Sequence, residues 1–108
     1  MDPAVKACVE HSLDNWLGER MPISRHWVEQ EVESLNGEDR AVARLALVLA
    51  KASYQLDQGL VSDVLGHGPD EPRFIRILAW ASFSAARRFA QLVAEDAGAF
   101  PGDTRRAA

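Results

Sequence analysis

Residues 41–54, AVARLALVLAKASY, constrain the fold more than any other part of this sequence. Acidic residues precede the run at positions 38 and 39, where they suit the first turn of a helix because they face the positive end of its dipole. The run is then apolar on almost every side of a helix. A surface helix carries one apolar stripe, whereas a helix that is apolar all round is covered by neighbours. We therefore expect a central helix over residues 38–55.

Apolar residues at helical spacing predict further helices around this central one. Asp2 and Pro3 suit the start of the first, because Asp accepts hydrogen bonds from free helix amides and Pro has no amide to satisfy. Gly18, Asn36–Gly37 and Gly66 are suitable helix ends. The predicted helices span about residues 3–17, 24–36, 38–55, 57–65 and 71–97.

The apolar stripes of the outer helices are the candidate core. The first stripe is formed by Val5, Val9, Leu13 and Trp16, with Cys8 and Ser12 at its edge. The second is formed by Trp27, Val28, Val32 and Leu35. The stripe of the last helix is formed by Phe74, Leu78, Ala81, Ala85, Phe89 and Leu92. Because no segment alternates like a half-buried strand, the predicted fold is all-α, a compact bundle of four to five helices.

The chain length favours one domain, because 108 residues are too few for two separate cores. We assign residues 1–98 to a single all-α domain. Residues 99–108, AFPGDTRRAA, have no periodicity and little to bury, so we expect a flexible C-terminal tail.

The charges are unevenly distributed along the chain. Residues 1–39 hold nine acids and three bases, whereas residues 73–106 hold six bases and three acids. This difference predicts that the N-terminal helices pack against the last helix, in the same chain or in a neighbouring one. The bases expected to pair with the acidic segment or with a partner subunit are Arg73, Arg76, Arg87 and Arg88.

Composition excludes several classes of protein. A net charge of -4 gives no general electrostatic attraction for nucleic acid. The most apolar stretches, 41–50 and 74–94, are interrupted by arginines that are costly in lipid, so we expect no membrane span. Residues 1–16 contain scattered charges and no uninterrupted apolar segment, unlike a signal peptide. A lone thiol fits a reducing compartment, and we expect a cytoplasmic location.

Few residues are candidates for chemistry. Cys8 and His11 are three residues apart on one predicted helix, so the imidazole could approach the thiol and lower its pKa. They are the candidate catalytic residues of a one-thiol nucleophile or peroxide sensor. The alternative is that Cys8 packs at the edge of the stripe while His11 is solvated. Since His11, His26 and His67 lie on different segments, we expect no metal site, and no motif indicates a cofactor.

Residues 45–90, LALVLAKASYQLDQGLVSDVLGHGPDEPRFIRILAWASFSAARRFA, resemble the C-terminal helical portion of the alkylhydroperoxidase AhpD and carboxymuconolactone decarboxylase superfamily. The resemblance extends over about residues 39–94. The final helix of that superfamily often carries a Phe-Asn-x-x-Asn-Arg-Leu-Ala type string. Here Phe83, Arg88 and Ala90 match this string, while both asparagines are replaced.

The resemblance implies an oligomeric all-α subunit with a small-molecule pocket between helices. Members that reduce peroxides carry Cys-x-x-Cys with a histidine four residues later and a glutamate upstream, so that one thiolate attacks the peroxide and the second resolves the sulfenic acid. Residues 8–11, Cys-Val-Glu-His, offer one thiol and a histidine three residues on. The catalytic roles of the superfamily are therefore not transferred to this chain.

Two functions remain as expectations. One is a diverged domain of this superfamily without the redox dithiol, acting as an oligomerising or partner-binding module because its helices present more apolar surface than so short a chain can cover. The alternative is a one-cysteine peroxide or thiol redox enzyme, or a small-molecule-binding enzyme, of the same superfamily. Whether the chain is catalytic, and whether it is a detached half of a longer redox protein, stays open at this point.

Overall fold

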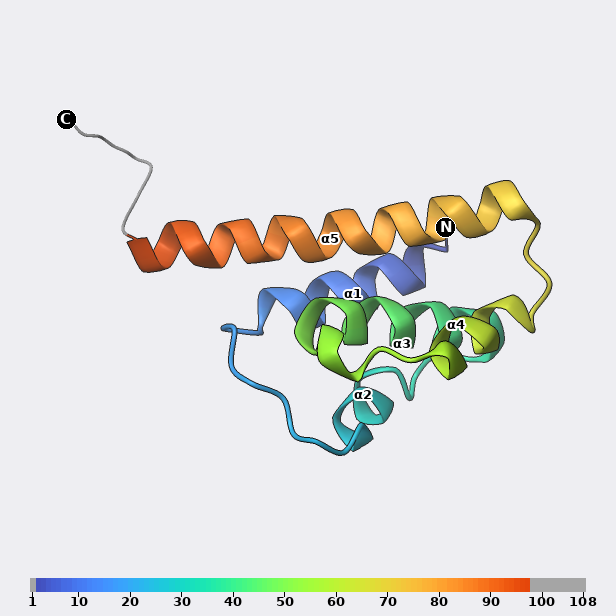
Figure 1. The fold of residues 1–108 in the computed structure, drawn as a ribbon, viewed down its shortest axis with the longest axis horizontal. Coiled ribbons are helices and arrows are strands. Elements are labelled where there is room, and N and C mark those ends of the chain that lie inside the picture. The colour runs from blue at the N-terminus through green and yellow to red at the C-terminus, as the bar shows by residue number, and fades with distance from the viewer. Residues whose placement is uncertain (1, 98–108) are drawn as a thin grey trace.

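The computed structural model describes residues 2–97, which form α-helices and one short 3₁₀ helix (Figure 1). The elements are α1 (Pro3–Asp14), α2 (His26–Glu31), α3 (Gly37–Lys51), the 3₁₀ helix η1 (Ser53–Gln55), α4 (Gln58–Leu65) and α5 (Glu71–Ala97). No strand occurs in the described part of the chain, so the predicted all-α class is confirmed. The predicted tail, residues 99–108, lies outside the described residues.

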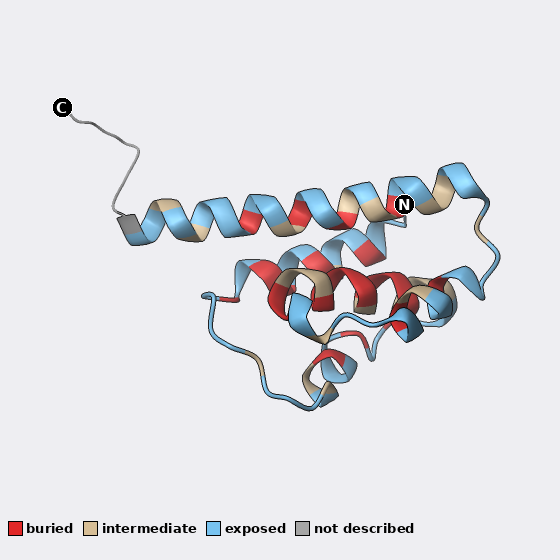
Figure 2. Ribbon diagram, viewed as in Figure 1, coloured by how far each residue is buried: buried red, intermediate tan, exposed pale blue. Residues whose placement is uncertain are grey.

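Helix α3 is the centre of the structure, as predicted. Helices α1, α4 and α5 pack against it, and α2 and η1 also contact it. Buried residues therefore occur on most of its surface (Figure 2). The helix ends at Lys51 rather than near Gln55, because the backbone of Ala52 leaves helical geometry. Gln55 then donates hydrogen bonds to the carbonyls of Pro22 and Ile23, at 2.6 and 3.1 Å, which holds this turn against the loop before α2.

Two helices end earlier than predicted, and in each case a side chain donates to backbone carbonyls near or after the helix end. Helix α1 ends at Asp14 instead of Leu17, where the Asn15 side chain donates to the carbonyl of His11 at 2.8 Å. Helix α2 ends at Glu31 instead of residue 36, and the guanidinium of Arg40 donates to carbonyls in the segment that follows. Gly37 has a positive φ of 55°, as expected of a helix-end glycine, but it opens α3.

The predicted stripes of α1 and α2 form the core. The confirmed core residues of these two stripes are Val5, Val9, Leu13, Trp16, Val28, Val32 and Leu35, with Trp27 partly buried. Asp57 and Asp70 cap α4 and α5 by accepting hydrogen bonds from the amides of Leu60 and Arg73. The cap at Asp70 fixes the end of the loop after α4, from which α5 runs back over α1 and α3.

The predicted stripe of α5 is wrong in part. Ala81 is buried, but Phe89 is 66% exposed, and the other predicted positions are only partly buried. The line of α5 that faces the core is formed by Ile77, Ala81, Ser84 and Arg88. Because α5 carries apolar residues on both sides, periodicity alone does not identify the buried side. The buried side is marked by Arg88, which donates hydrogen bonds to carbonyls at the end of α1.

Candidate functional site

The predicted pair Cys8 and His11 borders a shallow hollow between α1 and the end of α2. The hollow has a volume of about 490 Å³. It is lined by Ala4, Ala7, Cys8, His11, Ser12, Glu31, Ser34 and Leu35. Positions 8, 11 and 12 share one side of α1, so helical spacing places the thiol, the imidazole and a hydroxyl beside the Glu31 carboxylate.

The Cys8 thiol is arranged as a hydrogen-bond donor. Its Sγ lies 3.3 Å from the carbonyl oxygen of Glu31 and donates to it. Burial raises the pKa of Cys8, and the negative charge of Glu31 raises it further. No hydrogen bond joins Cys8 to His11 within residues 2–97, and Nδ1 of His11 instead lies 3.5 Å from the side-chain nitrogen of Asn15. The surroundings of Cys8 therefore favour the protonated thiol over the nucleophilic thiolate.

Beneath the hollow, three polar side chains connect α1, α2 and α3. The hydroxyl of Ser12 donates to Oε1 of Glu31 at 2.5 Å. The ammonium of Lys51 donates to Oγ of Ser12 at 2.7 Å and to the same Glu31 oxygen at 3.3 Å. The Lys51 side chain is only 5% exposed, and its ammonium lies 5.8 Å from the centre of the Trp27 ring. A charge buried this deeply requires such partners, because an unpaired ammonium is costly to remove from water.

This Ser12–Glu31–Lys51 network leaves little capacity for chemistry. Burial by itself would raise the pKa of Glu31, but the hydrogen bond from Ser12 and the charge of Lys51 outweigh it and hold the pKa below its ordinary value. An ionised Glu31 with lowered basicity is a poor general base. The hydroxyl of Ser12 both donates and accepts within the network. The arrangement is therefore suited to locking three helices together.

The arginines of α5 were expected to pair with acids of the N-terminal segment, and two of them do so within the chain. Arg73 binds Glu38 through both guanidinium nitrogens. Arg87 lies 3.9 Å from the carboxylate of Glu10. This part of the expectation is confirmed.

For Arg88 the expectation of an acidic partner is wrong, because the side chain binds backbone oxygens. It is 8% exposed, and it donates to the carbonyl of Trp16 at 2.5 and 3.2 Å and to the carbonyl of Asp14 at 3.3 Å. Carbonyls at the C-terminal end of a helix have no partner within the helix, and they favour a positive charge. Arg88 therefore caps α1 from α5, and this requirement fixes which side of α5 faces inward.

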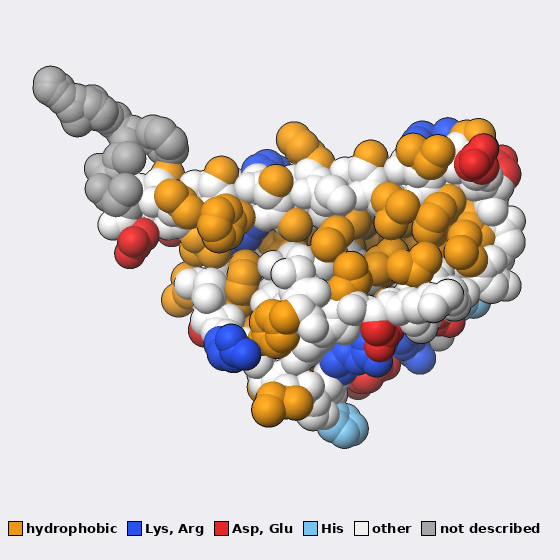
Figure 3. Space-filling model, in the orientation of Figure 1, with side chains coloured by type: hydrophobic (Ala, Val, Ile, Leu, Met, Phe, Trp, Pro, Cys, Tyr) orange, Lys and Arg blue, Asp and Glu red, His pale blue; other side chains and the backbone are white. Residues whose placement is uncertain are grey.

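The opposite side of α5 is an uncovered apolar surface. Its exposed large side chains are Ile75 (57%), Phe83 (67%), Phe89 (66%) and Val93 (51%). At 100° per residue they share the outward side of the helix with Ala79, Ser82, Ala86 and Ala90. Hydrophobic side chains accordingly project from the solvent side of α5 (Figure 3). We call these eight residues the outer face of α5.

Two further kinds of site are not found in residues 2–97. The described histidines, cysteine and carboxylates contain no group of three that is placed to hold a metal ion. No described helix is both long and apolar enough to cross a membrane.

Fold and contacts together define an all-α helical unit with one thiol. Over 88 residues the chain is 31% identical to an alkyl hydroperoxide reductase of Mycobacterium tuberculosis. The match includes 82% of this chain and 26% of the relative, so the chain spans about a quarter of that protein's length. No family model matches the chain, and no solved structure matches it significantly. The match supports the resemblance to the AhpD-like superfamily that was seen in the sequence.

Proposed function

We propose that this chain is a diverged AhpD-like unit without the redox dithiol, and that it associates with a second copy through the outer face of α5. The observation that carries the proposal is the group of four large apolar side chains on this face, each more than half exposed. Monomeric proteins rarely expose large contiguous apolar patches, and those that occur often mark interaction sites. Covering these side chains would gain about 25 cal/mol for each Å² of apolar surface removed from water.

The order of residues on the outer face supports a second copy as the partner. Ile75 and Val93 lie nine positions on either side of Ser84, and Ala79 and Phe89 lie five positions on either side. Two antiparallel α5 helices related by a twofold axis would therefore place Ile75 against Val93 of the second copy. A twofold interface uses the same surface on both subunits and requires this kind of self-complementary pattern.

Size-exclusion chromatography with light scattering tests the proposal. We expect the wild type to have the mass of two chains, and Phe83→Asp to shift it to one, because the carboxylate would be buried in an apolar interface without a partner. A matched control is Ile23→Asp, which makes the same kind of change at a 94% exposed side chain outside α5. The control should keep the wild-type mass. A wild type that is monomeric at micromolar concentration would contradict the proposal.

The activity in the name of the mycobacterial relative is not part of this proposal. Two-thiol peroxide reduction needs an attacking and a resolving cysteine, and the sequence holds Cys8 alone. The raised pKa of Cys8 also gives no support to the one-cysteine alternative. We further propose a cytoplasmic location, on the basis of the single unpaired thiol.

A further inference from the structure

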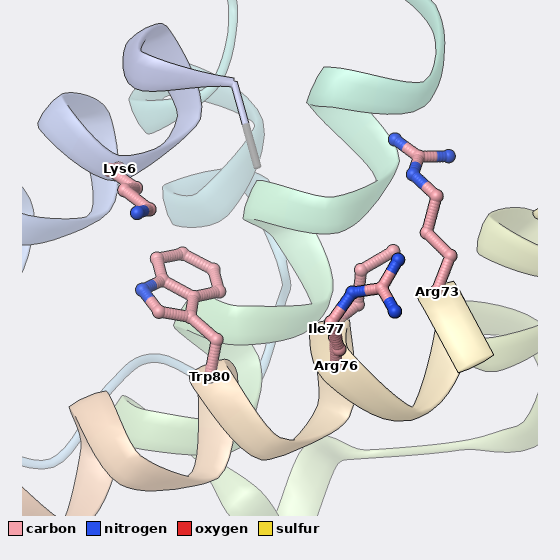
Figure 4. A pocket seen from close by; sticks show the side chains of 5 residues that line it. All are labelled: Lys6, Arg73, Arg76, Ile77 and Trp80. Carbon is pink, nitrogen blue, oxygen red and sulfur yellow. The ribbon is translucent and has the colours of Figure 1, made fainter.

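A second cavity lies between the N-terminal parts of α1 and α5, away from the hollow beside Cys8. Its volume is about 200 Å³. It is lined by Lys6 of α1 and by Arg73, Arg76, Ile77 and Trp80 of α5 (Figure 4). Cationic groups and a large flat aromatic ring therefore meet in one small space.

Two of the three cations are available to a ligand. Arg73 is engaged by Glu38, and the charge of Asp39 also acts on it, so we do not count it as free. Lys6 and Arg76 are exposed, and neither forms an ion pair with another described residue. These two side chains provide an ammonium and a guanidinium whose donors face solvent.

The wall of the cavity between these cations is apolar and flat. Trp80 is partly buried, and Ile77 beside it is buried. Lys6 extends toward the indole of Trp80, while the guanidinium of Arg76 lies in front of Ile77 (Figure 4). The cavity thus presents an apolar surface with a cation at each side.

The Trp80 indole differs from the other two indoles in its hydrogen bonding. The indole nitrogens of Trp16 and Trp27 donate to the Glu19 carbonyl and the Gln55 side chain, at 3.0 and 3.3 Å. The indole nitrogen of Trp80 has no hydrogen-bond partner among residues 2–97. A partly buried tryptophan usually finds a partner for this group. A ligand oxygen could fill that role.

We propose that this cavity binds a small aromatic carboxylate. The ring would lie against Trp80 and Ile77, and the carboxylate would accept hydrogen bonds from Lys6 and Arg76, which are stronger than neutral ones because both partners are charged. The volume is below that of a site for a drug-sized ligand, so the site suits a molecule with a single ring. An anion without a ring would leave the apolar wall uncovered.

Calorimetric titration of the full chain with benzoate tests this assignment, with neutral benzamide and inorganic phosphate as comparison probes. We expect benzoate to bind about tenfold tighter than either. Lys6→Gln and Arg76→Gln should each raise the Kd for benzoate about tenfold. Arg20→Gln is the matched control, because it removes the same charge from an arginine that lies 4.8 Å from the centre of the Tyr54 ring and does not line the cavity.

Three results would overturn the proposal. The first is an absence of benzoate binding. The second is an equal loss of affinity in Arg20→Gln and Arg76→Gln, which would show that net charge alone attracts the probe. The third is phosphate binding as tightly as benzoate, because the aromatic wall would then contribute nothing.

Discussion

Helices α3 and α5 are both apolar on more than one side, yet residues 2–97 surround only α3. Helix α3 lies among α1, α4 and α5, and its Val42, Leu45, Leu47 and Val48 are at most 3% exposed. Helix α5 has α3 and α1 on its inner side, while its outer face keeps Phe83 and Phe89 about two-thirds exposed. An apolar side of a helix thus predicts a packing partner. It does not say whether that partner is another helix of the same chain or a second molecule.

The first prediction compares one residue from each helix. Leu47 of α3 is fully buried, so Leu47→Ala should lower the free energy of unfolding by about 2–5 kcal/mol through lost apolar burial and the cavity left behind. Phe83→Ala on the outer face of α5 should change the stability of a single chain by less than about 0.5 kcal/mol. Urea unfolding at one low protein concentration measures both. Equal losses would refute the distinction between a covered and an uncovered helix.

The second prediction compares two adjacent arginines of α5, of which Arg88 is buried and Arg87 is exposed. Arg88→Met should cost about 1–3 kcal/mol, because the carbonyls at the end of α1 would lose a buried, charged donor. Arg87→Met should cost no more than about 0.5 kcal/mol, because the Arg87–Glu10 pair is half exposed on both sides. Amide hydrogen exchange near residues 11–17 reports the same difference locally. If both variants exchange alike there, Arg88 is not the cap of α1.

Much of this architecture was predictable from local patterns. Asp2 caps α1 as expected, and α5 spans the predicted residues 71–97. Each of these features depends on residues a few positions apart. Helical spacing and capping rules describe such neighbours well.

The polar contacts between helices were not predictable in the same way. The Ser12–Glu31 and Ser12–Lys51 hydrogen bonds join residues 19 and 39 positions apart, and Arg88 reaches carbonyls 72 and 74 positions away. Periodicity carries no information on such pairs. Lys51, which follows the apolar residues 45–50 at the end of α3, is a signal that could have suggested a buried polar partner. It does not say which acid or hydroxyl that partner is.

The smallest predicted effect concerns Cys8, which is partly buried and lines the hollow between α1 and the end of α2. Because its pKa is raised in the folded chain, the rate of alkylation by iodoacetamide should reach half its maximum above pH 8.5, roughly the ordinary value for a thiol. The thiol's contribution to stability should be present below the unfolded-state pKa and be lost as the pH rises through the higher folded-state pKa.

Two variants separate the causes of this shift. Glu31→Gln should lower the midpoint only in part, because burial is the larger cause and the Glu31 charge the smaller one. Cys8→Ser should abolish labelling and leave any peroxide reduction at the same background rate as the wild type. A midpoint near or below pH 7 would instead mean that His11 stabilises the thiolate. Cys8 would then be a reactive nucleophile, and the hollow beside α1, rather than the outer face of α5, would be the main candidate for the functional site.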